Sequence, residues 1–151
     1  MNTLRLISHR GNLNGLNHDR ENTPSFIDEA IDLGYDVEVD IRLVDSVLHL
    51  GHDGPENIIT LEWLHKRRSN LWIHCKNFEA LSFLLNYDLV IFFHEQESYT
   101  IINNGKIWAH DLSLVDNKCI IPLLSKEKII NWKSQPVYGV CSDYISLLKN
   151  D

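Results

Sequence analysis

Two carboxylates occupy a run that is otherwise typical of a buried β-strand, within the segment from Asp36 to Asp53, DVEVDIRLVDSVLHLGHD. Apolar and charged residues alternate there, so Glu38 and Asp40 share one strand face and lie about 6.5 Å apart along it. Buried like charges require a cation or hydrogen-bonding partners, and carboxylate oxygens are the ligands that hard metal ions prefer. The sequence therefore predicts a metal site, which His52 approaches from the end of the next short strand. The alternative is an exposed edge strand with solvated charges.

Further polar residues follow the ends of other strand-like runs. They are His9 and Arg10, His74 and Lys76, His94 and Glu95, and His110 and Asp111. A parallel α/β barrel carries its active site at these carboxyl ends. One such histidine alone is more often structural, but together these strand-end residues predict a catalytic site.

The best-marked local structure is a helix near the start of the chain. Thr23 is a good N-cap, Pro24 suits the first helical position, and Gly34 closes the apolar helical pattern. Strand-like runs precede it at residues 4–8 and follow it from Asp36. This order predicts a βαβ unit, whose two strands pair in parallel through a right-handed crossover.

The rest of the chain repeats this pattern more loosely. Further strands are expected at 47–50, 71–76, 89–94, 106–110, 119–124 and 137–141, and further helices at 60–68, 77–87, 126–133 and 143–149. Residues 1–151 are short for a complete eight-stranded barrel. We therefore predict one α/β domain, a compact, helix-depleted TIM-type (β/α) barrel of parallel strands. An open doubly wound sheet is the alternative.

The composition excludes several classes of protein. The net charge of -7 argues against a nucleic-acid-binding surface, and no apolar run reaches the ~20 residues of a membrane span. The first residues enter strand-like sequence without the apolar core of a signal peptide, so we expect a cytoplasmic protein. Cys75, Cys119 and Cys141 are odd in number and lie in apolar runs, which indicates buried, reduced thiols.

Four short motifs occur in one order along the first third of the chain. They are HRG at His9 to Gly11, EN at Glu21-Asn22, EVD at Glu38 to Asp40 and HD at His52-Asp53. In letters, order and spacing they resemble the signature of the glycerophosphodiester phosphodiesterases, within the phosphatidylinositol-phospholipase-like barrel superfamily. LWIHCK at 71–76 resembles the third strand of that family, and YGVCSDY at 138–144 resembles its last strand.

This resemblance implies a TIM-type barrel that cleaves a small phosphodiester with a divalent cation, usually magnesium or calcium. It assigns acid and base catalysis to His9 and His52, in an order it leaves open, and phosphate binding to Arg10 and Lys76. It assigns metal binding to Glu21, Glu38 and Asp40. We also expect Trp108 to contact the substrate. The assignment suits the chemistry, because a cation with arginine and lysine stabilises phosphoryl charge, and histidine transfers protons near neutral pH.

The chain departs from the family at His74, where a third metal-binding glutamate is usual. Imidazole is a softer ligand than carboxylate, so His74 as a metal ligand shifts preference from magnesium or calcium towards a transition metal. Two alternatives to the enzyme follow: an inactive barrel that binds a phosphorylated ligand, and a subunit of a larger assembly. We also expect self-association into a homo-oligomer, because missing helices would leave apolar sheet surface uncovered.

Overall fold

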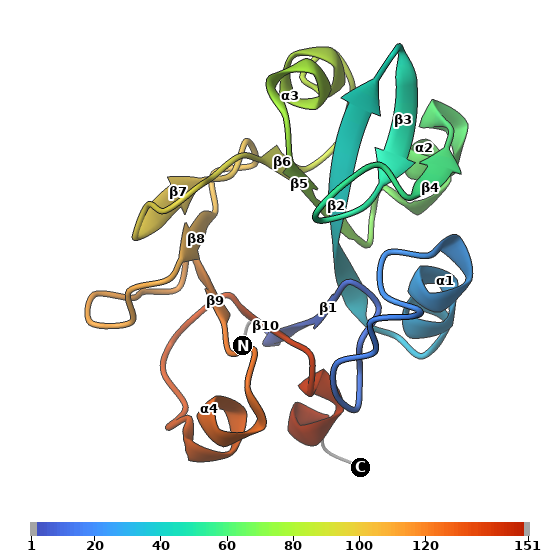
Figure 1. The fold of residues 1–151 in the computed structure, drawn as a ribbon. Coiled ribbons are helices and arrows are strands. Elements are labelled where there is room, and N and C mark those ends of the chain that lie inside the picture. The colour runs from blue at the N-terminus through green and yellow to red at the C-terminus, as the bar shows by residue number, and fades with distance from the viewer. Residues whose placement is uncertain (1–2, 150–151) are drawn as a thin grey trace.

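The computed structural model describes residues 3–149, which form a curved mixed sheet with helices on its outside (Figure 1). The strands are β1 (Arg5–His9), β2 (Asp36–Val44), β3 (Val47–Leu50), β4 (Asn57–Ile59), β5 (Leu71–Cys75), β6 (Ile91–Phe92), β7 (Tyr99–Ile101), β8 (Ile107–Ala109), β9 (Cys119–Pro122) and β10 (Gly139–Ser142). The helices are α1 (Pro24–Asp32), α2 (Leu61–Arg67), α3 (Phe78–Leu84), α4 (Lys126–Asn131) and the 3-10 helix η1 (Ile145–Leu148). The predicted βαβ unit is confirmed, since β1 and β2 pair in parallel and α1 connects them.

The sheet combines parallel and antiparallel pairing. Seven strands run parallel in the spatial order β6-β5-β2-β1-β10-β9-β8. β3 pairs antiparallel with β2 and with β4, and β7 pairs antiparallel with β8. The predicted TIM-type barrel of parallel strands is therefore wrong, because the fold is an open half-barrel with antiparallel pairs.

Two tight turns explain the antiparallel strands. Asp45 and Ser46 both have positive φ, 50° and 64°, and this two-residue turn sends β3 back along β2. Gly105, at φ 84°, lies in the turn that joins β7 to β8, where the amide of Ile102 donates to the carbonyl of Lys106. Such short connections cannot hold the crossover that parallel strands require. β4 and β7 were not among the predicted strands.

The half-barrel is open between β6 and β7, which do not pair in the described chain. Asn103 spans this gap instead. Its backbone amide donates to the carbonyl of Ile91 at 3.2 Å, and its side-chain oxygen accepts from the amide of Ile91 at 2.9 Å. Its side-chain amide also donates to the carbonyl of Leu89 at 2.8 Å. One residue thus provides hydrogen bonds that a strand ladder would otherwise supply.

Apolar side chains fill the inside of the half-barrel. They are Ile7, Trp72, Phe92, Ile102, Trp108, Ile120 and Cys141. Phe92 and Trp108 stack with their ring centroids 4.8 Å apart, which joins the two sides of the opening. The candidate site lies directly against this packed apolar layer.

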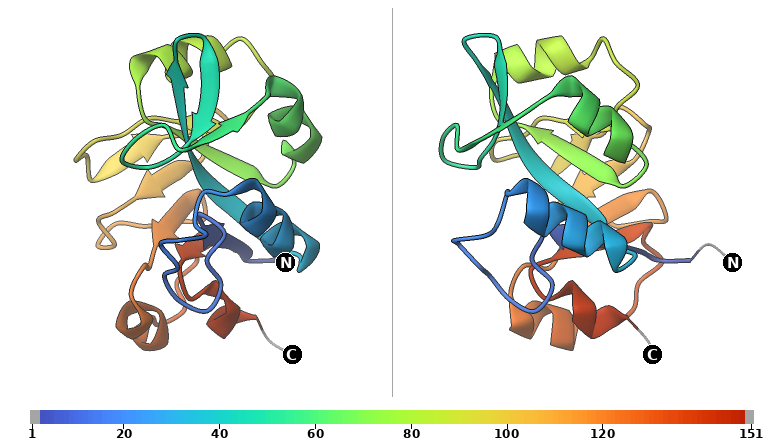
Figure 2. Two further views of the ribbon diagram at one scale, coloured as in Figure 1. Left: turned by 45° about the vertical axis from the view of Figure 1, so that its right-hand side comes forward. Right: turned by 90° about the vertical axis from the view of Figure 1, so that its right-hand side faces the viewer.

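The helices begin where the sequence places side-chain caps. The hydroxyls of Thr23, Thr60 and Ser125 and the amide oxygen of Asn77 each accept a backbone N–H of the first helical turn. The helices pack outside the sheet, as the side views confirm (Figure 2). In the described chain no helix lies between α3 and α4, so β7 and β8 have no helical cover.

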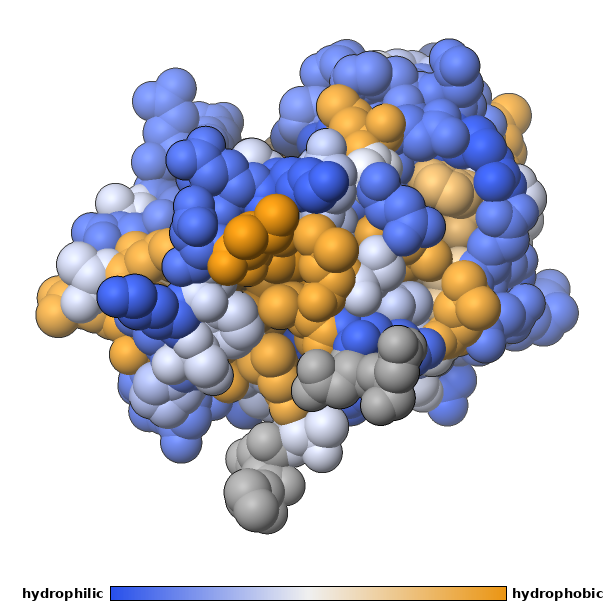
Figure 3. All heavy atoms as spheres, turned by 90° about the horizontal axis from the view of Figure 1, so that it is seen from below, coloured by the Kyte–Doolittle hydropathy of each residue, from blue (hydrophilic) through white to orange (hydrophobic). Residues whose placement is uncertain are grey.

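Figure 3 views the molecule from below and shows apolar residues gathered in the middle of that face, with polar residues around them. The helices α4 and η1 (the last, red helix) lie on the lower side in Figure 1. Ile130 of α4 and Leu147 of η1 are more than half exposed. Within residues 3–149 no helix has the length and apolar character needed to cross a bilayer.

Candidate metal-binding and catalytic site

The candidate site is the layer of inward-facing side chains next to the apolar interior. Alternate residues of a strand face the same side, so the residue two positions after an interior apolar side chain also points inward. On six strands, or just past their ends, these residues are His9, His74, His94, His110, Pro122 and Asp143. The first five of them line one hollow, together with Glu38.

The centre of this layer is a group of three potential metal ligands. Glu38 and Asp40 of β2 and His74 of β5 offer ligand atoms that all lie within 4.8 Å of one another. Asp40 and His74 are register partners on paired strands, and Glu38 shares the strand face of Asp40. All three are buried, with 2%, 0% and 6% of their surface exposed. The alternative of an exposed edge strand is excluded, because β2 lies between β1 and β5.

Asp40 is held as a carboxylate by three neighbours. Its Oδ1 lies 3.2 Å from Nδ1 of His74, and its Oδ2 lies 2.8 Å from Nε of Arg10. The side-chain amide of Asn22 donates to Oδ2 at 2.9 Å. Burial opposes the charge, but the adjacent imidazole of His74 and the positive charge of Arg10 outweigh it and hold the pKa of Asp40 below its usual range.

Glu38 has the opposite environment. Its Oε2 is buried and has no hydrogen-bond partner within residues 3–149. Two imidazoles lie near this carboxyl group: Nε2 of His9 is 3.6 Å from Oε2, and Nδ1 of His74 is 3.9 Å from Oε1. Burial, together with the nearby charge of Asp40, raises the pKa of Glu38 to about 7. Two carboxyl groups on one strand face are therefore driven to different protonation states, which is common at functional sites.

His9 is oriented by a carboxylate at the end of β10. Its Nδ1 lies 2.8 Å from Oδ1 of Asp143, and the same oxygen accepts a hydrogen bond from the side-chain amide of Asn12 at 2.9 Å. Burial favours the neutral ring, but the hydrogen bond to Asp143 and the charge of Glu38 outweigh it and raise the pKa of His9. Nε2 of His9 is left facing Glu38.

The loop after β1 adopts an unusual backbone to deliver these side chains. Arg10 has φ 60° and Asn22 has φ 55°, and the amide of Asn22 donates to the carbonyl of Arg10 at 3.0 Å. The amide of Arg10 in turn donates to the carbonyl of Glu38 at 2.9 Å. Gly11, at φ 96°, admits no side chain, because a Cβ there would lie 2.8 Å from the ring of Phe26. Left-handed backbone at an arginine is uncommon and typical of functional loops.

Glu21 lies next to the group formed by Glu38, Asp40 and His74, here called the trio, but is not part of it. Its Oε1 accepts from Arg10 at 3.3 Å, and its Oε2 accepts from Asn12 at 3.3 Å. Arg10 therefore lies between the carboxylates of Glu21 and Asp40. The structure brings together Glu38, Asp40 and His74, which could hold a metal ion, and places Glu21 against the guanidinium of Arg10.

The hollow next to the trio has a volume of about 170 Å³. Its lining comprises His9, Arg10, Glu38, His52, His74, His94, Trp108, His110, Pro122 and Leu124. His52 is partly exposed, with 39% of its side chain accessible, and its Nδ1 lies 2.7 Å from Oδ1 of Asp53. Arg42 fixes the position of His52, since its guanidinium donates to the backbone carbonyls of Gly51 and His52.

The other two predicted substrate contacts differ in position. Trp108 lines the hollow and stacks on Phe92. Lys76 directly follows β5, is half-buried and is not among the residues that line this hollow. Its backbone amide donates to the carbonyl of Ile41 at 2.8 Å.

Two histidines that the sequence places at strand ends, but to which no individual role was assigned, complete the wall. The ring of His74 stacks on that of His94 with centroids 4.3 Å apart, and His94 meets the edge of His110 at 4.7 Å. Burial and the neighbouring rings lower the pKa of His94 to about 4, and burial also lowers the pKa of His110. Both rings are therefore neutral near pH 7. Their place at strand ends was the sequence signal for them, and Asp143 carries the same signal.

The three ligand residues fit a divalent cation. Within the described residues, Oε2 of Glu38 and Oδ1 of Asp40 are buried and make no hydrogen bond, which is costly unless another group satisfies them. A cation close to Nδ1 of His74 would satisfy both oxygens. Two carboxylates with one imidazole form a mixed oxygen and nitrogen donor set, which suits manganese, cobalt or zinc as well as harder ions.

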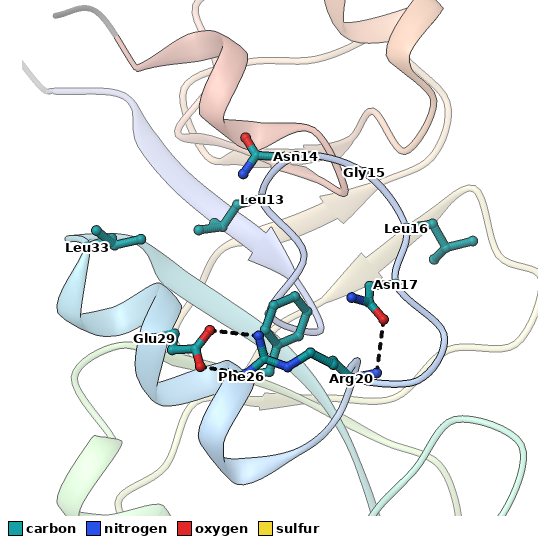
Figure 4. A pocket seen from close by; sticks show the side chains of 10 residues that line it. Leu13, Asn14, Gly15, Leu16, Asn17, Arg20, Phe26, Glu29 and Leu33 are labelled. Carbon is teal, nitrogen blue, oxygen red and sulfur yellow. Dashed lines mark hydrogen bonds and ion pairs between the residues drawn. The ribbon is translucent and has the colours of Figure 1, made fainter.

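A larger hollow of about 480 Å³ lies away from this cluster, between the loop after β1 and α1 (Figure 4). Arg20 there makes a two-point ion pair with Glu29 and lies over the ring of Phe26. Leu13 and Leu33 line it as well. Its charged groups are already paired with each other, so its size alone does not make it a reaction site.

The chain matches no family model, no curated protein and no solved structure. The function of this site must therefore be inferred from its own residues and geometry.

Proposed function

We propose that this protein is a metal-dependent phosphodiester hydrolase that acts on a small glycerophosphodiester-like or glycan-linked diester, as a shortened relative of the glycerophosphodiester phosphodiesterases. One observation carries the proposal. The unpartnered oxygens of Glu38 and Asp40 lie beside His74, and Glu38 and His74 line a hollow shared with His9 and Arg10. A cation site, a cationic side chain and a histidine in one small hollow are the groups that phosphodiester cleavage needs.

The residues divide the work as follows. When bound, the metal supplies Lewis-acid stabilisation of a non-bridging phosphoryl oxygen. Arg10, held between Asp40 and Glu21, presents a fixed positive charge to the same phosphate. His9 is oriented through Nδ1 by Asp143, which leaves its Nε2 for proton transfer.

His52 is the proposed second proton-transfer group. It lies at the exposed rim of the hollow, where a leaving alcohol would meet solvent. Its Nδ1 is bonded to Asp53, so this histidine also has a carboxylate partner that orients the ring. One of His9 and His52 acts as the acid and the other as the base.

We further propose a metal, a cellular compartment and self-association for this protein. We propose magnesium or calcium from the motif resemblance, with a transition metal as the alternative that His74 favours. We propose cytoplasmic residence, which the three free and buried cysteines support. Self-association is proposed from the apolar side chains gathered on the underside (Figure 3).

A second candidate function is an inactive barrel that binds a phosphorylated ligand. The observation in its favour is that Arg10 already neutralises Asp40, while the pKa of Glu38, raised to about 7, lets it remain protonated up to near neutral pH. Such a site is stable without an ion. Binding without turnover would support this function.

Turnover of bis-p-nitrophenyl phosphate separates the two functions. The protein would be assayed with magnesium, calcium, manganese, cobalt and zinc in turn, each with a chelator control. We expect metal-dependent release of p-nitrophenol that Glu38→Gln abolishes and that Glu79→Gln, an exposed glutamate on α3, leaves unchanged. No turnover with any metal, or equal turnover in Glu38→Gln, would contradict the hydrolase.

A further inference from the structure

A second hollow adjoins the candidate site on the side of β9 and α4. Its volume is about 410 Å³, and its walls include Leu112, Leu123, Trp132 and Lys128. His110 and Pro122 line both this hollow and the one at the trio, so the two hollows meet at these residues. In Figure 1, α4 lies beside the β9 segment, on the opposite side of the ring from α3.

The two hollows have different chemistry. The hollow at the trio is small, about 170 Å³, and contains the charged groups and most of the imidazoles. Typical small-molecule sites occupy about 300–1,000 Å³, so the charged hollow alone is small for a whole substrate. The adjoining hollow has leucine, proline and tryptophan in its walls, while the exposed Lys128 and Lys133 are its charged groups and Asn131 and Gln135 are further polar ones.

One buried donor in these walls lacks a partner. The indole N–H of Trp132 is buried and makes no hydrogen bond within residues 3–149. This nitrogen has almost no accessible surface, so the walls offer a bound ligand apolar contact rather than this donor.

We propose that this adjoining hollow, here named the α4 groove, binds an apolar alcohol arm of the diester, an alkyl or acyl chain, while the phosphate lies at the trio. The inference builds on the proposed function, and it goes beyond it by naming the substrate class. A polar arm such as glycerol or a sugar would leave the leucine and tryptophan walls without matching contacts. The groove would therefore give the enzyme a preference for diesters with one apolar arm.

The test measures binding, so that it does not depend on turnover. Methyl phosphate and hexyl phosphate are titrated calorimetrically into the metal-loaded protein. Each methylene buried in an apolar site strengthens binding several-fold, so we expect hexyl phosphate to bind about tenfold or more tightly than methyl phosphate. Leu112→Asp should remove this difference. Leu114→Asp is the matched control, because Leu114 is two residues away, 80% exposed and not in the groove.

The outcomes separate this inference from the proposed hydrolase. Leu112→Ser, a milder change, replaces Leu112→Asp if the aspartate variant has lost its thermal unfolding transition. A preference for hexyl phosphate that depends on Leu112 supports the groove, even if no diester is hydrolysed and the hydrolase itself fails. Equal affinities, a preference insensitive to Leu112, or no binding of either phosphate would overturn the groove. Hydrolysis of bis-p-nitrophenyl phosphate in that case would leave the hydrolase standing.

Discussion

The two sides of the half-barrel are built in different ways. The side formed by β1, β2 and β5 has strands of five to nine residues, with capped helices in the connections. The side formed by β6 to β9 has strands of two to four residues, a hairpin and one bridging asparagine. The first side carries Glu38, Asp40 and His74, and the second carries mainly aromatic and apolar walls.

This difference reflects what each side must hold in place. Buried charges are tolerated only with partners at short distances, so they need long paired strands and a hydrogen-bonded loop. Apolar walls need only shape, and short irregular strands can provide it. We therefore expect substitutions on the first side to change the chemistry, and substitutions on the second side to change stability or substrate preference.

The largest expected effect is loss of the metal. Glu38→Gln keeps the size of the side chain but removes a ligand charge, so metal affinity should fall by more than about 100-fold, beyond the range typical for residues that only support a ligand. Turnover should fall with it. Calorimetric titration of each metal measures the affinity, and His110→Ala on the second side is the comparison, for which we expect nearly unchanged metal affinity. Equal losses in both variants would remove the distinction between the two sides.

The histidine variants come next. His9→Ala and His52→Ala should each lower kcat by about 10² to 10⁴, the usual range for a general acid or base, with metal affinity nearly unchanged. A leaving group of low pKa needs little protonation, so a diester carrying one should rescue the variant that lacks the acid and leave the other slow. Steady-state kinetics with paired leaving groups would assign the two roles. Wild-type rates in both variants would mean that the histidines are structural.

The metal-free protein should lose stability as pH rises towards the raised pKa of Glu38. The folded-state pKa of Glu38 is about 7, above the usual 4.5, so protonation of Glu38 stabilises the fold at low pH and this contribution is lost between about pH 4.5 and 7. The pKa of Asp40 is lowered, and its contribution is lost only at lower pH. The loss from Glu38 is at most about 3 kcal/mol.

Thermal unfolding in chelator at pH 5 and pH 7.5 measures this loss. The unfolding temperature should fall with pH in the wild type, should vary less in Glu38→Gln, and should recover at pH 7.5 when metal is added, because a cation stabilises the ionised carboxylate. A flat profile in the wild type would show that Glu38 is ionised throughout and that the trio is less buried in solution.

The sequence was informative where residue type and period agree. Alternation in β2 predicted that Glu38 and Asp40 share a face, and Thr23 with Pro24 marked the start of α1. The parallel barrel was wrong because β3, β4 and β7 pair antiparallel. The sequence marked a separate short strand at 47–50 after the turn at Asp45 and Ser46, but it did not mark β4 or β7. Gly105 indicated a turn, but the prediction of a strand at 106–110 did not use it to place a second strand, β7, before that turn.

Long-range partners were beyond the sequence. Asp143 lies 134 positions from His9, and only the pairing of β10 with β1 brings them together. Asn12 was hidden for the same reason, since its amide joins Asp143 to Glu21 across the loop. The structure brings Glu38, Asp40 and His74 within reach of one another and places Glu21 against Arg10, a difference that motif spacing does not show.

The smallest expected effect tests the second side alone. Asn103→Ala removes the side-chain oxygen that accepts from the amide of Ile91 and the amide that donates to the carbonyl of Leu89. Losing these bonds at the open edge should lower the free energy of unfolding by about 1–3 kcal/mol, the cost of leaving buried polar groups unpaired. Denaturant unfolding measures this value. Asn104→Ala is the control, because Asn104 is exposed and bonds only within its own turn.

The kcat of Asn103→Ala should stay within about twofold of wild type, because β1, β2, β5 and β10 hold the trio and His9. A large fall in kcat without a fall in the free energy of unfolding would mean that the open edge shapes the catalytic hollow as directly as the long strands do.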